Sequence, residues 1–353
     1  MRCSWTQTFE YRNLKPQRLE WALGLNLLKG ENGAGKTNVL EVLHLLSGWG
    51  PFRGRSSSDI PRWGNPTGKS VLRGGFEGEE SLELGALVSR RVDLRKDGKP
   101  IGASTVRSRV PALSFTPEDL ALVEGAPAVR RRFVDCLCAL LLPLYALRLL
   151  EYRRALRQRA AALRQGRGIS ATGRVLAPLA SWIWASREGA VDLLKVGLGE
   201  VEGLLPGPVE IRFNRGGSLG LEDCMEDFWA SLNRHARTEE RIGLPLVGPH
   251  RDDLFIGNGE KAAVLVYSRG HRRRVAVALM MAAGWAVERK LRRTPVLLLD
   301  EVAAELDEPG RDVLVRAMES RKWQVFAATA ENAFPEWPGA TWTVSGGSVL
   351  RTV

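Results

Sequence analysis

The feature that most constrains the fold of this 353-residue chain is a glycine-rich segment at residues 30–37. It fits the phosphate-loop pattern G-x-x-x-x-G-K-S/T at every fixed position. Its residues are Gly30, Glu31, Asn32, Gly33, Ala34, Gly35, Lys36 and Thr37. The apolar run at residues 23–28 predicts a buried strand before this segment, and residues 39–46 predict a helix after it. A strand, a glycine-rich turn and a helix in this order predict an α/β fold with a site for a nucleoside triphosphate.

The residue types of this segment suit the chemistry of a triphosphate. Glycines let backbone N–H groups close around phosphate oxygens, and the ammonium of Lys36 neutralises charge on the β- and γ-phosphates. The hydroxyl of Thr37 can complete the coordination shell of Mg²⁺. The next residue, Asn38, is included among the expected ATP contacts. Lys36 therefore has both a binding role and a catalytic role in this prediction.

The second half of the expected site lies near the other end of the chain, where the apolar residues 295–299 are followed by Asp300 and Glu301. The run predicts a buried parallel strand, and an acid at the carboxyl end of such a strand would lie beside the phosphate loop. Asp300 could then support Mg²⁺ through water, while Glu301 polarises the water that attacks ATP. The alternative is a core strand with an acidic helix cap, but two adjacent carboxylates would then repel each other without a cation.

Because the two half-sites lie at opposite ends of the chain, the sequence predicts a large insertion between them. We expect residues 1–125 and 240–353 to form one α/β ATPase lobe, and residues 126–239 to form a second, mainly helical lobe. Residues 100–110 and 216–220 have the composition of turns. No heptad pattern persists long enough to predict an extended coiled coil.

A Ser-x-Gly sequence, with Ser268 and Gly270, precedes a predicted helix. The apolar side of this helix is expected to hold Val275, Leu279, Ala282 and Ala286. A serine at a helix start presents a hydroxyl and free N–H groups to an anion, although an ordinary helix cap has the same sequence. The arrangement resembles the signature motif of ABC-type ATPases, in which the serine of one subunit closes on the γ-phosphate held by another. This resemblance implies that Ser268 and Gly270 act in trans and that Glu305, Leu306 and Asp307 form the D-loop.

Several further segments resemble the RecF family of SMC-like ATPases, and the resemblance covers nearly the whole chain. The segments are residues 30–41, 51–53, 115–120, 130–135 and 156–159, together with Tyr11, Arg12, Asn13 and Leu14. The most specific segment is Gly248, Pro249, His250, Arg251, Asp252, Asp253 and Leu254. The chain departs from the family at His271, where a glutamine is usual, and at Leu113, near the place of another glutamine. The threonine-rich stretch after the last core strand is reduced to Ala327, Ala328, Thr329, Ala330 and Glu331.

The resemblance implies an ABC/SMC-like head formed by both chain ends, with a short helical arm in place of a long coiled coil. It further implies an ATP-dependent DNA clamp of recombinational repair and replication-fork maintenance. Such a clamp forms a homodimer on duplex or gapped DNA, or at a junction of single- and double-stranded DNA, and assists RecA loading with RecO and RecR. Slow, DNA-stimulated hydrolysis of ATP to ADP and phosphate would release it. The departures keep a second hypothesis open, a degenerate nucleotide-sensing scaffold with little hydrolysis and no direct DNA contact.

The charge of the chain favours a polyanionic partner such as DNA. It holds 51 basic and 40 acidic residues, a net charge of +11, and has a pI near 9.9. A predicted helix at residues 149–163 is rich in arginine and poor in acids. The candidates for DNA contact are Arg153, Arg154, Arg157, Arg159 and Arg164. The alternative is a solvated arginine-rich helix. Because aromatic residues do not alternate with these arginines, backbone contacts are favoured over base stacking.

A membrane partner is disfavoured by the sequence. Residues 136–150 are apolar but contain Pro143 and Arg148, and fewer than about 18 uninterrupted apolar residues do not span a bilayer. No signal peptide is recognisable at the N-terminus. The four cysteines lack the paired spacing of a zinc site, which indicates reduced thiols. We therefore expect a cytoplasmic protein that binds ATP, Mg²⁺ and DNA.

Overall fold

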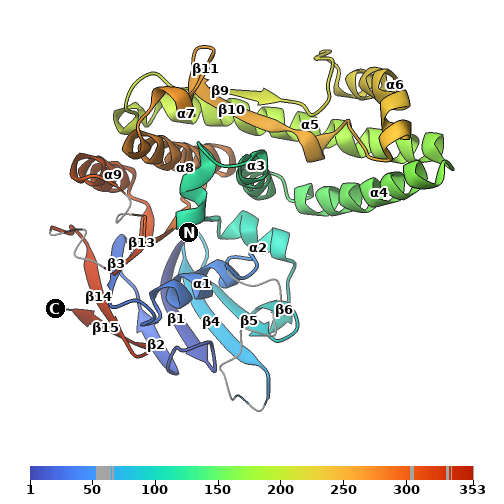
Figure 1. Ribbon diagram of the computed structural model, residues 1–353. Helices are drawn as coiled ribbons and strands as arrows, with labels where there is room; N and C mark the ends of the chain where they lie inside the picture. The colour runs from blue at the N-terminus through green and yellow to red at the C-terminus, as the bar shows by residue number, and fades with distance from the viewer. Residues whose placement is uncertain (53–64, 66, 303–305, 331–333, 335, 353) are drawn as a thin grey trace.

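The computed structural model of the protein describes residues 1–52, 65, 67–302, 306–330, 334 and 336–352 (Figure 1). A central sheet combines strands from the two ends of the chain. Its strands are β3 (Leu25–Lys29), β8 (Ala112–Phe115), β12 (Val296–Asp300), β13 (Gln324–Thr329), β14 (Ala340–Ser345) and β15 (Ser348–Thr352). They lie in the order β15-β14-β3-β13-β12-β8, and all neighbours are parallel except β15, which is antiparallel to β14.

A second, antiparallel sheet forms in the N-terminal third of the chain. Its strands are β1 (Arg2–Phe9), β2 (Gln17–Glu20), β4 (Ser70–Glu77), β5 (Leu82–Val88), β6 (Val92–Lys96) and β7 (Lys99–Pro100), in the order β2-β1-β4-β5-β6-β7. Helix α1 (Lys36–Leu46) packs against both sheets. Leu40 of α1 belongs to one buried cluster with Leu28 and Phe326 of the central sheet and Leu72 of β4. This cluster is the core beneath the phosphate loop.

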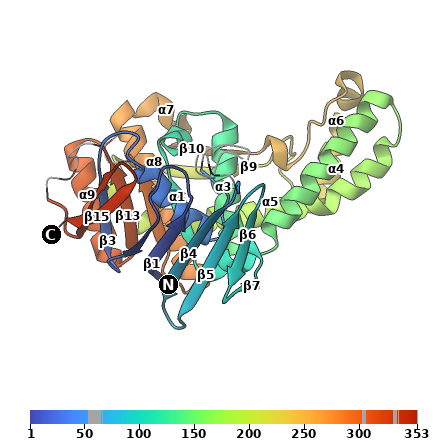
Figure 2. The ribbon, with the colours of Figure 1, turned by 90° about the horizontal axis from the view of Figure 1, so that it is seen from below.

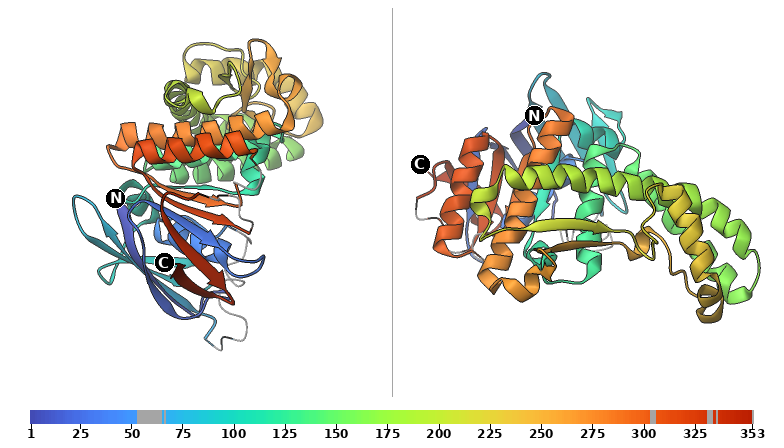
Figure 3. Two further views of the ribbon diagram at one scale, coloured as in Figure 1. Left: turned by 90° about the vertical axis from the view of Figure 1, so that its left-hand side faces the viewer. Right: turned by 90° about the horizontal axis from the view of Figure 1, so that it is seen from above.

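Helices cover the opposite face of the central sheet (Figure 3). They are α3 (Pro127–Leu141), α8 (Arg269–Leu291) and α9 (Glu308–Arg321). Successive strand residues point to opposite faces, so Leu27, Leu297 and Val325 join these helices in a second buried cluster. Every residue of α8 from 275 to 284 is buried, so the expected single apolar side of this helix underestimates its burial. One cause is that Gly197, in the helix at residues 169–199, lies close to the backbone of α8. A Cβ at this position would lie 2.6 Å from the backbone oxygen of Ala282.

The segment between the two half-sites contributes long helices, some of which project from the rest as an arm (Figure 2). These helices are α4 (Tyr145–Gln165), α5 (Ile169–Gly199) and α6 (Cys224–Ile242). A third sheet has the order β11-β10-β9, with β9 (Glu210–Asn214), β10 (Asp253–Asn258) and β11 (Lys261–Ala262). The short helices are α2 (Ala103–Arg109), α7 (Ala263–Val266), η2 (Pro117–Leu122), η3 (Glu202–Leu204) and η4 (Pro249–Arg251).

This architecture confirms the predicted fold class, an ABC/SMC-like α/β head from both chain ends with an inserted, mainly helical part. The predicted turn at residues 100–110 is wrong, because α2 forms there. The Arg107 guanidinium lies over the Trp49 ring and donates to the backbone oxygen of Gly48 at 2.6 Å, so tertiary packing stabilises a helix too short for a periodic signal. The lobe boundaries at residues 126 and 239 stay a prediction. Helix α5 extends from the arm onto α8, and its residues share a cluster with those of α8.

A buried charge network joins the arm to the rest of the fold. Arg187 of α5 donates to Asp252 Oδ2 at 2.6 Å and to the Pro249 backbone oxygen at 2.7 Å. It also donates to Asp135 of α3 at 2.8 Å. The other oxygen of Asp252 accepts from the Trp184 indole at 2.8 Å. Arg187 is 2% exposed and Asp252 0%, so each charge depends on the other for compensation. This gives Asp252, in the segment most specific to the family resemblance, a structural role.

His250 of the same segment connects α4 to this network. The Tyr152 hydroxyl donates to His250 Nδ1 at 2.7 Å, and Nε2 lies 3.2 Å from the Pro245 backbone oxygen, which can only accept. These bonds assign the neutral Nε2–H tautomer to His250. Burial lowers the pKa of His250 to about 4, despite an opposing contribution from the hydrogen bond to Pro245.

Replacing Arg187 with Met should destabilise the fold strongly, because Asp252 and Asp135 would lose a buried cation. We expect the free energy of unfolding to fall by about 3–5 kcal/mol in urea titrations. Arg148→Met is the matched control, since the Arg148–Glu151 pair is exposed and should be worth less than about 1 kcal/mol. Equal stability of the two variants would contradict a structural role for the network.

Candidate functional site

The phosphate loop connects the end of β3 to the start of α1, and its geometry explains its glycines. A Cβ at Gly30 would lie 2.1 Å from the backbone oxygen of Val344, so no other residue fits against β14. Gly35 has φ 117°, a left-handed conformation that favours glycine. It is also the N-cap of α1, so the free N–H groups of the first turn face the loop. The loop therefore has the backbone required to surround an anion.

The ammonium of Lys36 lies within this loop, and the side chain is 5% exposed. Its Nζ donates to the backbone oxygens of Gly30 at 2.8 Å and Glu31 at 3.1 Å. It also lies 3.2 Å from Glu301 Oε1. The Thr37 hydroxyl lies 2.9 and 3.0 Å from the two carboxylate oxygens of Asp300. The structure thus brings together the four side chains that the sequence placed in one site from opposite ends of the chain.

Glu301 occupies a special backbone position directly after β12. Its φ is 53°, a left-handed conformation that costs a non-glycine residue about 1 kcal/mol. Its backbone N–H donates to the Ala328 oxygen at 2.9 Å, and its Oε2 accepts from the Ala330 N–H at 3.0 Å. These bonds fix the carboxylate between β13 and Lys36. A fixed carboxylate beside the phosphate loop can orient and deprotonate a water molecule.

A second group of residues holds the loop, and for Tyr11, Arg12, Asn13 and Glu41 this role was not predicted from the sequence. The Asn13 amide donates to the Gly33 backbone oxygen at 2.9 Å and accepts from Asn38 at 2.7 Å. The Tyr11 hydroxyl and the Arg12 guanidinium both donate to Glu41, a carboxylate that is 1% exposed within α1. The residues after β1 and the first turns of α1 therefore form one rigid support. The available signal was the sequence Tyr11-Arg12-Asn13, recognised only as a family feature.

Asn38, one of the predicted ATP contacts, is hydrogen-bonded to Asn13 within the chain. The remaining predicted loop contacts, Glu31, Asn32, Gly33 and Ala34, lie in the turn itself. The Ala34 backbone oxygen accepts from the Gly347 N–H at 3.1 Å, which anchors the loop to the turn between β14 and β15.

Ser268 is the N-cap of α8, and its hydroxyl accepts from the His271 N–H at 3.3 Å. The cap uses the backbone of His271, so replacing the usual glutamine leaves it intact. A Cβ at Gly270 would meet none of the described residues within 4 Å, so packing against them does not require glycine there. In the described part of the chain, neither Ser268 nor Gly270 is hydrogen-bonded to the phosphate loop. Their action in trans stays a prediction.

Two of the three predicted D-loop residues can be placed. Leu306 is buried in the core, and Asp307 caps α9 by accepting from the Gly310 N–H at 3.1 Å. Glu305 lies outside the described residues, as do Arg53 of a segment that resembles the family and Glu331 of the stretch that departs from it. The D-loop role of these residues stays a prediction.

The prediction that Arg159 contacts DNA is wrong. The Arg159 side chain is 3% exposed and its Nε lies 3.2 Å from an oxygen of Glu239, which is 0% exposed. A second nitrogen of the guanidinium donates to the backbone oxygen of Ile169 at 3.1 Å. Arg159 therefore joins α4 to α6 and the start of α5. Its spacing from Tyr152 and Ala155, both buried on α4, was a signal that could have identified it as internal.

The other four candidates are exposed on α4 and form what we call the basic stripe: Arg153, Arg154, Arg157 and Arg164. At about 100° per residue, they fall within a sector of roughly 100°, opposite the buried side of the helix. They extend over roughly 16 Å along its axis. Arg153 also lies 3.6 Å from Asp135, a partly exposed pair that leaves it 59% exposed. The stripe is a cationic surface on the arm.

The central sheet, the phosphate loop and the facing carboxylates together define a phosphate-loop ATPase head of the ABC/SMC class. A family model described as the RecF/RecN/SMC N terminal domain matches residues 7–338. The chain is 31% identical over 369 residues to the "DNA replication and repair protein RecF" of Heliobacterium modesticaldum, covering 97% of each sequence. It is 34% identical over 349 residues to the protein of that name from Deinococcus deserti, covering 96% of this chain and 91% of the relative. The chain belongs to the RecF family.

Solved structures agree with this fold. A structure of "the recombination mediator protein RecF-ATP in RecFOR pathway" has a TM-score of 0.86 at 23% identity, covering 100% of this chain and 98% of that chain. An Smc head bound to the C-winged helix domain of ScpA has a TM-score of 0.58 at 14% identity, covering 100% and 97%. Among the described residues, no helix is long and apolar enough to cross a membrane.

Replacing Lys36 with Ala should weaken the binding of ATP by at least about tenfold, because a charge-assisted contact to phosphate would be lost. Isothermal titration with Mg²⁺ present measures this affinity. Lys99→Ala, which removes an exposed lysine from β7, is the control and should bind like the parent protein. Unchanged affinity of a folded Lys36→Ala variant would contradict the assignment of the loop.

Proposed function

We propose that this protein is an ATP-gated DNA-binding protein of recombinational repair that pairs with a second copy of itself. The observation that carries this proposal is the meeting of Lys36 and Thr37 with Asp300 and Glu301 in one site. Membership of the RecF family supports it, as do the names of relatives in replication and repair. Residues 30–38 would hold the triphosphate. Thr37 and Asp300 would hold Mg²⁺, which, when bound, neutralises phosphate charge.

The residues of this site also support hydrolysis. Glu301 would accept a proton from a water molecule as that water attacks the terminal phosphorus, and ADP would be the leaving group. Lys36 would stabilise the charge that develops on the phosphate oxygens. Because Glu301 already contacts Lys36 at 3.2 Å, triphosphate binding must redistribute the partners of Lys36 before the carboxylate can orient water. Because hydrolysis needs this rearrangement, it would be slow, and the slow step would set the time for which the protein stays on DNA.

The N-terminus of α8 supports pairing of two copies. Ser268 is exposed, and none of the described residues lies close enough to Gly270 to exclude a side chain there. The start of a 23-residue helix can receive an anion, so Ser268 and Gly270 of each copy would complete the ATP site of the other. Two ATP molecules would then lie between two heads, and assembly would depend on nucleotide by mass action.

The basic stripe on α4 supports contact with DNA. Its four arginines face solvent together, and their extent of roughly 16 Å is about half the pitch of a DNA duplex. The stripe lacks aromatic residues, which favours contacts to phosphates over base reading. We propose duplex or gapped DNA, or a junction of single- and double-stranded DNA, as the ligand. RecR, RecO and RecA are the proposed protein partners in loading of RecA.

Replacing Glu301 with Gln should preserve ATP binding but lower the hydrolysis rate by roughly 10²–10⁴-fold, because the amide cannot accept the proton of water. The ATP-bound pair of subunits should then accumulate. Phosphate release and sedimentation velocity measure the two effects, and Glu319→Gln on the exposed side of α9 is the control. Rapid turnover by Glu301→Gln would exclude the general-base role.

Replacing the four arginines of the basic stripe with Gln should weaken DNA binding at all sequences and flatten its salt dependence. Each lost phosphate contact lowers the log–log slope by about 0.9, so the four contacts together account for at most about 3.6. Binding to gapped duplex is measured with ATP and Mg²⁺ over a salt series.

The matched control replaces four exposed arginines of the N-terminal sheet region, Arg73, Arg90, Arg91 and Arg95. It lowers the net charge equally, from 51 − 40 = +11 to 47 − 40 = +7. If both variants lost the same DNA affinity, the effect would come from the net charge of the protein and not from the basic stripe. ATP binding without any DNA affinity in the parent protein would instead favour the nucleotide-sensing scaffold.

A further inference from the structure

Strand β9 leaves one edge of the third sheet open. The order β11-β10-β9 places β9 at the end of the sheet, and no described segment pairs with its outer side. Asn258 and Lys261 close a two-residue hairpin and are therefore a hydrogen-bonded pair. Bonding direction alternates along β10, so Gly257 bonds toward β9, where its register partner is Glu210.

The same alternation fixes the direction of the backbone groups along β9. Glu210 and Arg212 bond to β10, whereas the N–H and C=O groups of Ile211 and Phe213 point to the open edge. Such an edge is a template for another extended chain. A partner that satisfies these groups must supply alternating N–H and C=O groups of its own. A nucleic acid backbone cannot do this, so the edge selects a peptide.

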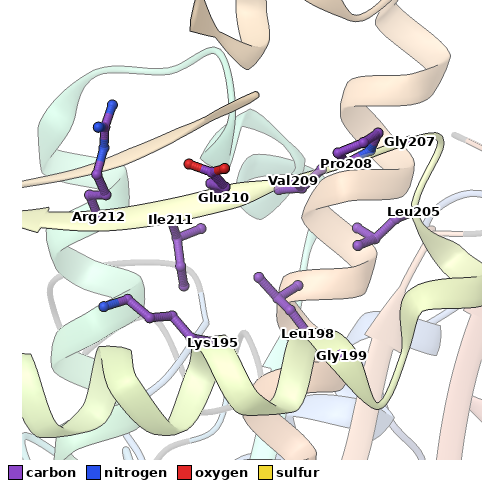
Figure 4. A pocket seen from close by; sticks show the side chains of 10 residues that line it. All are labelled: Lys195, Leu198, Gly199, Leu205, Gly207, Pro208, Val209, Glu210, Ile211 and Arg212. Atoms are coloured by element: carbon purple, nitrogen blue, oxygen red, sulfur yellow. The ribbon is translucent and has the colours of Figure 1, made fainter. Parts of the chain in front are cut away.

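A groove runs along this edge, between β9 and the C-terminal part of α5 (Figure 4). Its volume is about 520 Å³, and its apolar lining includes Leu198, Leu205 and Ile211. In Figure 4 the Ile211 side chain points toward α5, while Glu210 and Arg212 point away from it. The side of β9 that faces the groove is therefore apolar.

Three charged residues line the groove; Glu210 and Arg212 point away from α5, which leaves Lys195 as the charge inside it. Figure 4 shows its side chain between α5 and β9, below Ile211. Its partner Asp192 is one turn earlier on α5, and both side chains are exposed, so the pair is weak. A ligand with an acidic side chain at this place would gain a second partner for the ammonium. Charge complementarity therefore favours an acidic residue beside the apolar ones.

We propose that the open edge of β9 and the groove beside it bind an extended segment of a partner protein, which adds to the sheet as a fourth strand. Alternate side chains of the segment would enter the groove, apolar ones against Leu198, Leu205 and Ile211, and an acidic one against Lys195. Backbone bonds to Ile211 and Phe213 provide affinity, and the groove provides selectivity.

A strand bound here would lie close to the start of α8. The Tyr267 hydroxyl donates to the backbone oxygen of Pro208 at 2.6 Å, and Pro208 lines the groove. Tyr267 immediately precedes Ser268. A bound partner would thus restrict the segment that presents Ser268 to a second copy. This consequence rests on the proposed role of Ser268, whereas the docking itself does not.

The test uses a fluorescein-labelled heptapeptide, acetyl-Thr-Leu-Thr-Val-Thr-Asp-Thr-amide, whose Leu, Val and Asp lie on one side of a strand. Fluorescence anisotropy with the full chain, without nucleotide, measures binding. N-methylation of single residues removes one donor at a time. We expect affinity losses of about tenfold at alternate residues and little change at the others, because only alternate N–H groups face β9. Absence of binding, or losses without this alternation, would overturn the proposal.

A charge exchange tests the orientation of the segment in the groove. Lys195→Glu should bind the heptapeptide more weakly, and replacing its Asp with Lys should restore affinity to this variant only. Lys99→Glu, which reverses an exposed charge on β7, is the control. Lys36→Ala should bind the peptide like the parent protein, so failure of the ATP site and failure of this site are separable. Self-association without nucleotide that the peptide competes away would assign the edge to a second copy and overturn the proposal.

Discussion

The position of β13 between β3 and β12 is the constraint on which the rest of the structure depends. Parallel strands lie about 4.8 Å apart, so the loops after β3 and β12 emerge from the same edge of the sheet at roughly 10 Å from each other. Thr37 and Asp300, 263 positions apart in sequence, meet within hydrogen-bond distance for this reason. Both faces of the sheet are covered, which keeps these strands rigid and leaves the loops to provide the chemistry.

The long helices extend this rigid centre into the arm. Helix α8 lies on the sheet and begins directly after its N-cap, Ser268, and α5 packs against α8 through the close approach at Gly197. Arg187, on the same α5, anchors the base of the arm through Asp252. The proposed DNA-contacting stripe on α4 and the proposed trans-acting serine therefore belong to one continuous packed framework. A movement at one end of this framework is therefore transmitted to the other end, as the proposed dependence of DNA contact on nucleotide requires.

The sequence predicts those parts of the site whose residues are adjacent along the chain. The strand, turn and helix around Lys36 and the apolar run before Asp300 are local patterns with a physical requirement behind each residue. The sequence does not predict contacts between residues that are far apart along the chain. Arg159 pairs with Glu239, 80 positions later, and the residues adjacent to either one do not indicate this pairing. The support of the loop by Asn13 and the open edge of β9 likewise arise from tertiary packing. Helix α2 was missed because seven residues carry too little periodicity.

The order of strands also has a consequence for synthesis of the chain. Strand β3 is made early, yet both of its neighbours in the central sheet, β13 and β14, come from residues 324–345. Until the ribosome has delivered them, this apolar strand has two unpaired edges, and contacts of such large sequence separation form slowly. A nascent or truncated chain therefore presents an aggregation-prone surface and no phosphate site. Pairing of β3 and completion of the nucleotide site therefore depend on the same late step of synthesis.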